Sequence, residues 1–314
     1  MSEGSSATNN ARLTPTMMVQ LAAPHTWSAA IMPVVVGVAY AISVGSPVSL
    51  PLAAAMLAIS ILMQSAVNTF NDYMDYRTGT DTLDNQLDPT DAVLVYNNVS
   101  PRSVFVYFLG LMAAALVLGI IVVLRSSWIT LVIGLLAAAS IVAYSAGKTP
   151  LSYLPLGELV SGLVMGGFIT LATCYVLIGE FTLFYLVVAL PLIVSIGLIN
   201  MTNNTCDIEK DVEAERRTIP VLLGRKRAKQ AYVATMFAIE ILIYVLVGAM
   251  YLPGIAVCVM MSLAFYPGFK ALKANPLVLE SRGAAMAQVV TLNVTLNAFY
   301  ALALVAGSHM AVVL

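Results

Sequence analysis

The sequence NTFNDYMDYRTGTD, residues 68–81, follows directly on an apolar run that is long enough to cross a bilayer. A second stretch, NMTNNTCDIEKD at residues 200–211, follows another apolar run and repeats the pattern of amides and carboxylates. Carboxylates at the ends of apolar helices are costly, and a bound cation or a functional pathway is the usual reason for them. The two stretches together predict one shared site for a divalent metal ion and an anion.

The composition assigns the chain to the integral membrane proteins. Its 314 residues are 60% hydrophobic and only 10% charged, and its mean hydropathy is +0.90. Soluble domains are about half apolar and about a quarter charged. The three cysteines fit neither a disulfide framework nor a metal-binding pair, and the net charge of −1 indicates nothing about partners.

A window of about 20 apolar residues identifies roughly nine membrane-spanning helices. We therefore expect an all-α integral membrane protein with a polar cavity on its cytoplasmic side. The chain should form a single domain, residues 21–314, after a disordered cytoplasmic tail, residues 1–20, that lacks the features of a signal peptide. The expected spans are Trp27–Val44, Leu50–Phe70, Val104–Leu124, Ser127–Ala146, Leu156–Leu177, Thr182–Thr202, Ala228–Met250, Gly254–Leu272 and Ala284–Leu314.

The loop charges predict the orientation in the membrane. If the N-terminus is cytoplasmic, all of the 15 basic residues except Arg125 fall on the cytoplasmic side. This asymmetry is what the positive-inside rule expects. It places both acidic stretches at the cytoplasmic face of a multi-pass protein of the cell membrane, with the C-terminus outside.

Helical spacing aligns the polar side chains of each stretch. Residues three, four and seven apart share a helix face, which aligns Asn68 with Asp72 and Asp75, and Asn200 and Asn204 with Asp207 and Asp211. Oxygen ligands of this kind suit Mg²⁺, which usually binds through a few carboxylates together with phosphate oxygens and water. The nearby basic residues Arg77, Lys148, Arg216 and Arg217 are candidates for contacts with a diphosphate. An isoprenyl diphosphate, with its head in the polar cavity and its tail among the helices, is the ligand that this pattern favours.

These residues resemble the UbiA-type intramembrane prenyltransferases, and the resemblance extends over nearly the whole chain. The similar motifs are NDxxD at residues 71–75 with GTD at 79–81, the stretch YSAGKTPLSYLPLGE at 144–158, and NNxxDxxxD at 203–211. Within the family, the branch that uses 1,4-dihydroxy-2-naphthoate in menaquinone biosynthesis is the most similar. The resemblance implies nine transmembrane helices and Mg²⁺-dependent transfer of a polyprenyl group to an aromatic acceptor.

The resemblance also implies roles for individual residues. Mg²⁺ would be held by Asp72, Asp75, Asp207 and Asp211, with Asn68, Asn71, Asn203 and Asn204 as secondary ligands. The leaving diphosphate would be bound by Lys148, Arg77 and Tyr144, with Arg217 as a further candidate. Asp81 and Tyr144 are candidates for the base.

Some residues depart from the family pattern, and two alternatives stay open. Cys206 and Glu215 replace an expected basic residue and an expected glycine, and residues 88–100 differ from the usual segment before the third span. This segment would help to cap the site, so the donor length and the acceptor are not fixed. One alternative is a family enzyme with another acceptor, such as a different quinone precursor, a porphyrin or a glycerol phosphate. The other is a divalent-cation transporter, which the scarcity of ionisable residues in the outer half disfavours.

Overall fold

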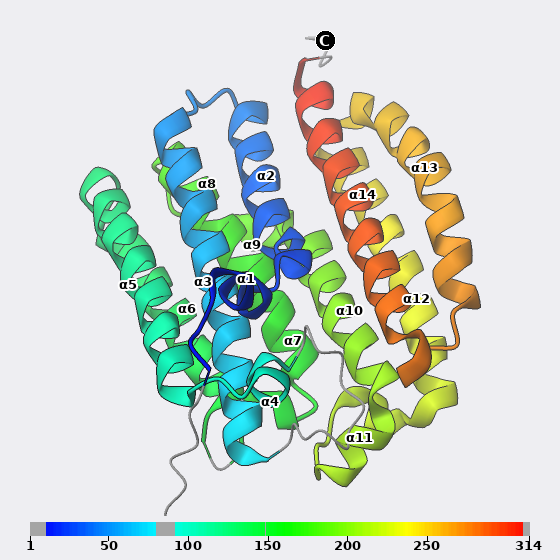
Figure 1. The fold of residues 1–314 in the computed structure, drawn as a ribbon. Helices are drawn as coiled ribbons and strands as arrows, with labels where there is room; N and C mark the ends of the chain where they lie inside the picture. Colours follow the sequence, from blue (N-terminus) through cyan, green and yellow to red (C-terminus); the bar gives the residue numbers. More distant parts are fainter. Residues whose placement is uncertain (1–10, 80–91, 148, 310–314) are drawn as a thin grey trace, which may run out of the picture.

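The computed structural model describes residues 11–79, 92–147 and 149–309, and over these residues the chain is a bundle of helices (Figure 1). The described residues form no strand, and the isolated bridge between Ala11 and Val99 is their one β contact. A π-helical segment, Gly162–Phe168, joins α7 to α8. In chain order the α-helices are α1 (Pro15–Ala22), α2 (Ser28–Ser43), α3 (Leu50–Thr78), α4 (Val93–Asn97), α5 (Pro101–Arg125), α6 (Trp128–Ser145), α7 (Gly157–Ser161), α8 (Ile169–Ile178), α9 (Phe184–Val188), α10 (Leu190–Cys206), α11 (Ile208–Glu213), α12 (Ile219–Met250), α13 (Ile255–Ala274) and α14 (Arg282–His309).

The length and composition of these helices confirm a protein with several membrane spans. Within the described ranges, seven helical segments are long and apolar enough to cross a bilayer, and a bent pair, Pro15–Thr26 with Ser28–Ser43, would make an eighth. The expected count of nine spans is therefore not reached. The difference lies at α9 and α10, which have 5 and 17 residues and are each shorter than the about 20 residues that one straight span needs.

The structure corrects the extent of the expected N-terminal tail. Residues 15–20, which the composition assigned to the tail, belong to α1. Thr14 caps this helix, because its side chain accepts a hydrogen bond from the backbone N–H of Met17, and Pro15 occupies the first turn. Leu21, at the far end of α1, is buried against α4. Local capping and the burial of Leu21 therefore order a segment that was assigned to the tail. Residues 1–10 lie outside the described residues.

The helices that carry the two acidic stretches end at the same side of the bundle. α3 ends at Gly79, whose φ of +74° is the left-handed conformation that glycine adopts readily. α10 passes into the short helix α11, and the chain then enters α12, which is interrupted at Gly224 (φ +72°, ψ 155°). In Figure 1 the end of α3 and α11 both lie at the lower end of the bundle. The two stretches, more than a hundred residues apart in sequence, are thus spatial neighbours.

Glycines let α10 approach the π-helical segment closely. A Cβ atom on Gly162 would lie 2.2 Å from the carbonyl oxygen of Ile193, and one on Gly166 would lie 2.6 Å from the Ile193 backbone nitrogen. Small residues at helix contacts allow backbones to meet in membrane proteins, so these two positions exclude any side chain. The contact fixes α10, which carries the second acidic stretch, against the helices that complete the site.

Candidate active site

One cavity of about 1260 Å³ runs from the ends of α3 and α10 into the bundle. Its other walls are mostly apolar side chains of α3, α5, α6 and the segment from α7 to α8. A cavity with one polar end and long apolar walls suits an amphipathic ligand. The polar end is formed mainly by Asn68, Asn71, Asp72, Tyr144, Asn200, Asn203, Asn204, Arg216 and Arg282.

Asp72 of the first acidic stretch is buried beneath α4. Its Oδ2 accepts a hydrogen bond of 3.1 Å from the backbone N–H of Val93. Val93 and Leu94 are themselves buried and pack in one cluster with Leu21 of α1. The segment that departs from the family pattern therefore covers the first acidic stretch through α4, as a cap of the site should.

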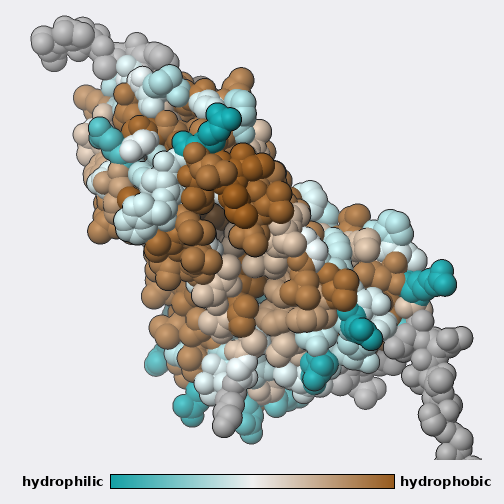
Figure 2. Space-filling view, turned by 90° about the vertical axis from the view of Figure 1, so that its left-hand side faces the viewer, coloured by the Kyte–Doolittle hydropathy of each residue, from teal (hydrophilic) through white to brown (hydrophobic). Residues whose placement is uncertain are grey.

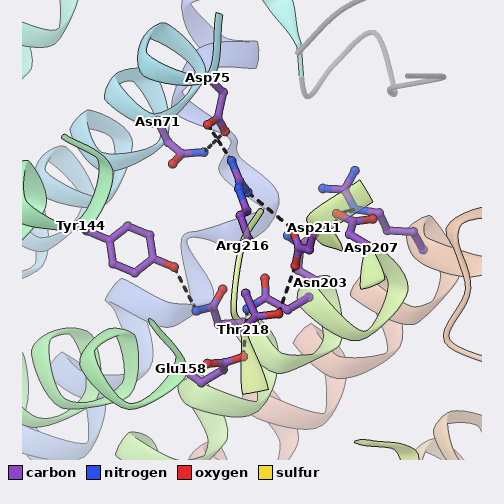
Figure 3. Close-up of polar contacts among 12 residues, drawn as sticks. Asn71, Asp75, Tyr144, Glu158, Asn203, Asp207, Asp211, Arg216 and Thr218 are labelled. Atoms are coloured by element: carbon purple, nitrogen blue, oxygen red, sulfur yellow. Dashed lines mark hydrogen bonds and ion pairs between the residues drawn. The ribbon is translucent and has the colours of Figure 1, made fainter. Parts of the chain in front are cut away.

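Asn71 orients the carboxylate of Asp75. The Asn71 Nδ2 donates to Asp75 Oδ2 over 3.0 Å, and the Asn71 Oδ1 accepts from the Ser145 hydroxyl over 3.1 Å. Because Ser145 is the last residue of α6, this chain of bonds ties α3 to α6. Asp75 consequently presents its other oxygen, Oδ1, toward the second acidic stretch (Figure 3).

The second acidic stretch is held by α12 and α14. The Thr218 hydroxyl donates to Asp211 Oδ2 over 3.2 Å. The Arg282 Nε donates to Asn203 Oδ1 over 2.8 Å and lies 3.5 Å from Asp207 Oδ2. Arg282, at the start of α14, is a residue of the site that the sequence interpretation did not single out, and no local pattern marks it.

Arg216 joins the two acidic stretches. Its Nη2 donates to Asp75 Oδ1 over 2.9 Å, its Nη1 lies 3.7 Å from Asp211 Oδ1, and its guanidinium stacks on the Tyr153 ring at 4.6 Å from the ring centre. Burial lowers the pKa of Arg216, but Asp75, Tyr153 and Asp211 together more than offset this, so the pKa lies above its ordinary value. The cation therefore stays charged between the two carboxylates (Figure 3).

Asp211 has an unusual protonation equilibrium. The pKa of Asp211 is raised to about 6, mainly by burial and in part by the nearby Asp207 carboxylate, although Arg216 opposes the shift. An excess of carboxylates over cations in a buried site favours the binding of a further cation.

Amides and a tyrosine surround the carboxylates. The Asn200 Nδ2 donates to the Tyr144 hydroxyl over 3.0 Å, and the Asn204 Nδ2 donates to Glu158 Oε1 over 2.9 Å (Figure 3). Glu158 is buried, and its Oε2 has no hydrogen-bond partner among the described residues. Tyr144 lines the cavity. Glu158 is the last residue of the stretch 144–158, which resembles the family motif.

Asn68 has a different environment from the other amides. It lines the cavity, but its Nδ2 donates to the Ala22 carbonyl over 3.1 Å and to the Thr26 hydroxyl over 2.8 Å. Its Oδ1 accepts from Gln64 over 3.4 Å. These contacts fasten the bend between α1 and α2 to α3.

Two of the expected basic residues are not brought into this arrangement. Arg77 is exposed and donates to the Tyr73 hydroxyl over 3.0 Å. Arg217 is also exposed, and its backbone N–H donates to the Tyr153 carbonyl over 2.7 Å. Lys148 and Asp81 lie outside the described residues. Arg216 rather than Arg217 is thus the arginine of this segment that faces the cavity.

The donor atoms of the site fit a Mg²⁺ ion that is shared with a diphosphate. In the part of the chain that the structure describes, no three acidic, histidine or cysteine side chains lie close enough to hold a metal alone. The available donors are the oxygens of carboxylates and amides, and Mg²⁺ commonly takes one or two carboxylates and completes its shell with phosphate oxygens and water. Asp75 and Asp211 would be among the residues that hold the metal, and in this structure both carboxylates lie next to the Arg216 guanidinium.

Two bacterial proteins are similar in sequence to this chain over about two thirds of its length or more. The chain is 32% identical over 209 residues to the 1,4-dihydroxy-2-naphthoate octaprenyltransferase of Bacillus subtilis, which covers 67% of this chain and 66% of that protein. It is 29% identical over 229 residues to the protein of the same name from Mycobacterium tuberculosis, covering 72% of this chain and 76% of the relative. The chain thus spans just under two thirds of the Bacillus relative and about three quarters of the Mycobacterium one.

Solved structures share the fold. A UbiA homologue from Aeropyrum pernix in its apo state aligns with a TM-score of 0.68 and 19% identity, over 88% of this chain and 96% of that chain. A UbiA homologue from Archaeoglobus fulgidus bound to DMAPP and Mg²⁺ aligns with a TM-score of 0.58 and 17% identity, over 92% of this chain and 99% of that chain. The sequence profile of the UbiA prenyltransferase family matches residues 30–289. With most of its length inside this match, the chain belongs to the UbiA prenyltransferase family.

Proposed function

We propose that this protein transfers a polyprenyl group from a polyprenyl diphosphate to an aromatic acceptor in a Mg²⁺-dependent reaction. One observation carries the proposal: two acidic stretches from α3 and from α10 and α11 meet at the polar end of a cavity whose other walls are apolar. The named relatives are octaprenyltransferases, and the Archaeoglobus homologue was solved with DMAPP and Mg²⁺. Both findings support a diphosphate and a metal at this end.

The residues of the site have distinct proposed roles. Asp72, Asp75, Asp207 and Asp211 would hold Mg²⁺, with Asn71, Asn203 and Asn204 beside them and Asn68 at the cavity wall. When bound, Mg²⁺ neutralises the charge that develops on the leaving diphosphate. Arg216 and Arg282, which line the cavity, are placed to bind diphosphate oxygens. The earlier candidates Lys148, Arg77, Tyr144, Arg217 and Asp81 stay proposals for the same head group or for the base.

The apolar walls determine what happens after the carbon–oxygen bond breaks. Cleavage of this bond leaves an allylic cation, which water would capture in an open site. Apolar side chains around the reacting carbon exclude water, so the electron-rich ring of the acceptor reacts instead. With 1,4-dihydroxy-2-naphthoate as acceptor, the cation bonds to the ring carbon that bears the carboxylate, and this carboxylate leaves as carbon dioxide, which restores the aromatic ring.

We propose 1,4-dihydroxy-2-naphthoate as the acceptor because the names of the Bacillus and Mycobacterium relatives both specify this compound. Another quinone precursor, a porphyrin or a glycerol phosphate would be consistent with the same head-group site. We further propose that the end with the acidic stretches faces the cytoplasm, because the described basic residues other than Arg125 belong to this side of the predicted topology.

A reconstituted assay tests the function directly. Purified protein in detergent or liposomes is incubated with Mg²⁺, radiolabelled polyprenyl diphosphate and 1,4-dihydroxy-2-naphthoate, and the lipids are extracted and separated. A Mg²⁺-dependent prenylated naphthoquinol is the expected product. Release of diphosphate without this product would refute the acceptor and keep the metal site, whereas no consumption of the donor by folded protein would refute the prenyltransferase proposal.

A further inference from the structure

Four carboxylates are buried in the part of the chain that the structure describes. Three of them, Asp72, Asp207 and Asp211, belong to the acidic stretches, and the fourth is Glu158, which is 5% exposed. The surface is different, because in Figure 2 apolar side chains cover most of the face and hydrophilic ones gather toward its ends. An enclosed carboxylate in such a protein is costly and usually has a function. The proposed metal site gives the three aspartates a function and leaves Glu158 without one.

The carboxylate of Glu158 has a single hydrogen-bond partner among the described residues. Its Oε1 accepts from the Asn204 Nδ2 over 2.9 Å, while its Oε2 is enclosed and has no partner there. No ion pair with an arginine or lysine of the described ranges involves this carboxylate either. The amide of Asn204 is therefore the one described group that donates a hydrogen bond to Glu158.

This contact determines which end of the Asn204 amide faces the cavity. An ionised carboxylate accepts hydrogen bonds and cannot donate them, so only the NH₂ end of an amide can meet it. If the amide were turned round, its carbonyl oxygen would face Glu158 and leave a buried charge without a donor, which is strongly unfavourable. Asn204 lines the cavity, and its Oδ1 accepts no hydrogen bond from the described residues. This oxygen is the atom that Asn204 offers to the cavity.

The neighbouring amide of Asn203 has its oxygen engaged elsewhere. The Asn203 Oδ1 accepts from the Arg282 Nε over 2.8 Å. Asn204 is three residues before Asp207, and residues at this spacing share a helix face. An amide oxygen and a carboxylate on one face are donors of the kind that Mg²⁺ takes. Of the two amides, Asn204 is the one whose oxygen is left for a metal.

The backbone of α7 holds Glu158 against α10. A Cβ atom on Gly197 would lie 3.0 Å from the Glu158 carbonyl oxygen, so the two helices meet without a side chain between them. Gly197 and Asn204 are seven residues apart and share a face of α10. The side chain of Glu158 therefore reaches Asn204 from a backbone that this close contact fixes.

We infer that Glu158 is a positioning residue, which holds the Asn204 amide with its carbonyl oxygen toward the cavity so that this oxygen can serve as a ligand of the metal ion. The inference rests on the proposed function, which supplies the metal. Glu158 is not among the residues that line the cavity, so it acts through Asn204. Residues that orient a metal ligand from behind contribute about 10–100-fold to metal affinity or activity.

A double-mutant cycle tests this role through metal binding. Titration calorimetry of the purified protein with Mg²⁺ alone measures the affinity. We expect Glu158→Ala to weaken Mg²⁺ binding about 10–100-fold, because the freed amide no longer has one orientation, and Asn204→Ala to weaken it at least as much. The double variant should bind Mg²⁺ as Asn204→Ala does, because Glu158 acts only through this amide. A loss from Glu158→Ala that is equally large in the Asn204→Ala background would overturn the inference and assign the effect to the charge of Glu158.

Glu158→Gln separates orientation from charge. The glutamine oxygen can still accept a hydrogen bond from Asn204, so this variant should bind Mg²⁺ more tightly than Glu158→Ala. An affinity as low as that of Glu158→Ala would overturn the inference. Glu213→Ala is the matched control, because Glu213 is an exposed carboxylate at the end of α11, two residues after Asp211; its Mg²⁺ affinity should equal that of wild type.

The outcomes distinguish this inference from the proposed function. Wild-type protein that binds no Mg²⁺ and transfers no prenyl group would overturn the proposed function. Wild-type protein that does both, together with a Glu158→Ala variant of unchanged Mg²⁺ affinity, would overturn only the role of Glu158. Melting temperatures in EDTA report on folding. If Glu158→Ala does not fold, the cycle is run with Glu158→Gln, and a loss of affinity that persists in the Asn204→Ala background overturns the inference.

Discussion

The Arg216 guanidinium lies 2.9 Å from the Asp75 carboxylate and thereby ties the chain after the second acidic stretch to the first. The same guanidinium lies 3.7 Å from Asp211. If Asp75 and Asp211 hold Mg²⁺ as proposed, the Arg216 cation competes with the metal for the same two carboxylates.

Replacing Arg216 should therefore separate metal binding from turnover. We expect Arg216→Ala to bind Mg²⁺ more tightly than wild type in titration calorimetry, because the competing cation is gone. We expect kcat/KM for the diphosphate donor to fall at least tenfold, because a charge-assisted contact with the head group is lost. The metal-free variant should melt at a lower temperature, since a partly buried carboxylate loses its partner at a cost of about 1–3 kcal/mol.

Arg227→Ala is the matched control for this variant. Arg227 is an exposed arginine on α12, and its replacement should leave Mg²⁺ affinity, turnover and melting temperature unchanged. Weaker Mg²⁺ binding by Arg216→Ala would contradict the expected competition between Arg216 and Mg²⁺. It would show instead that Arg216 helps the site to bind the metal.

Substitution of the acidic residues should abolish transfer without unfolding the protein. Asp72→Asn and Asp207→Asn keep the side-chain shape and remove a charge that the metal needs. We expect each to lower kcat at least a hundredfold, because charge stabilisation by a metal contributes several kcal/mol to the transition state. Product formation from labelled donor measures the effect, and circular dichroism reports on folding.

The carboxylate of Glu209 provides the comparison for these two variants. It lies on α11, two residues after Asp207, and its side chain, 71% exposed, pairs with Arg225 over 2.6 Å. The hydrogen bond from Arg225 lowers the pKa of Glu209. Glu209→Gln should retain near wild-type turnover, and a loss as large as that of Asp207→Asn would show that the assay reports a general electrostatic effect.

Protons and Mg²⁺ should compete at Asp211. Burial raises the pKa of Asp211 to about 6 from an ordinary value of 3.8. Because the folded protein holds this proton more tightly than the unfolded chain does, lowering the pH from 7 through 6 toward 4 should stabilise the metal-free protein at this group. The same protonation removes a ligand charge, so Mg²⁺ affinity should weaken as the pH falls below about 6.

Two measurements check the pH dependence. Melting temperatures in EDTA are compared between wild type and Asp211→Asn from pH 4 to pH 8, and Mg²⁺ titrations are repeated over the same range. The difference in melting temperature should be largest above pH 6, where wild-type Asp211 is ionised, with the asparagine variant the more stable protein. A difference that does not vary with pH would mean that Asp211 stays in one protonation state throughout.

The close contact of α10 with the π-helical segment should tolerate no side chain. Gly166→Ala would place a Cβ atom 2.6 Å from the Ile193 backbone nitrogen, and relief of this overlap requires movement of backbone. We expect a destabilisation of about 1–3 kcal/mol and lower turnover, because α10 carries Asn200, Asn203 and Asn204. Gly268→Ala on α13, where nothing lies within 4 Å, should have the stability and turnover of wild type, and equal melting of the two variants would contradict the contact.

Helical periodicity explains why the sequence identified part of the site and why Arg77 lies apart from it in this structure. Asp72 and Asp75 share a helix face, and in the structure Asp72 lines the cavity while Asp75 pairs with Arg216, which lines it too. Arg77 is two residues after Asp75, about 200° around the helix, and four residues after Tyr73, to which it donates a hydrogen bond. The same angular argument thus assigns Arg77 to the opposite face, where the structure has it.

The sequence by itself determined the membrane class, most of the apolar helices, the two acidic stretches and the family, because these depend on local composition and spacing along the chain. Only the tertiary structure decided that Arg216 and not Arg217 faces the cavity. The chain reverses at Glu215, whose φ is +56°, and this turn sets the direction of the next side chain. Arg282 and Glu158 were likewise assigned to the site by packing, because contacts between helices far apart in sequence leave no periodic signal within either helix.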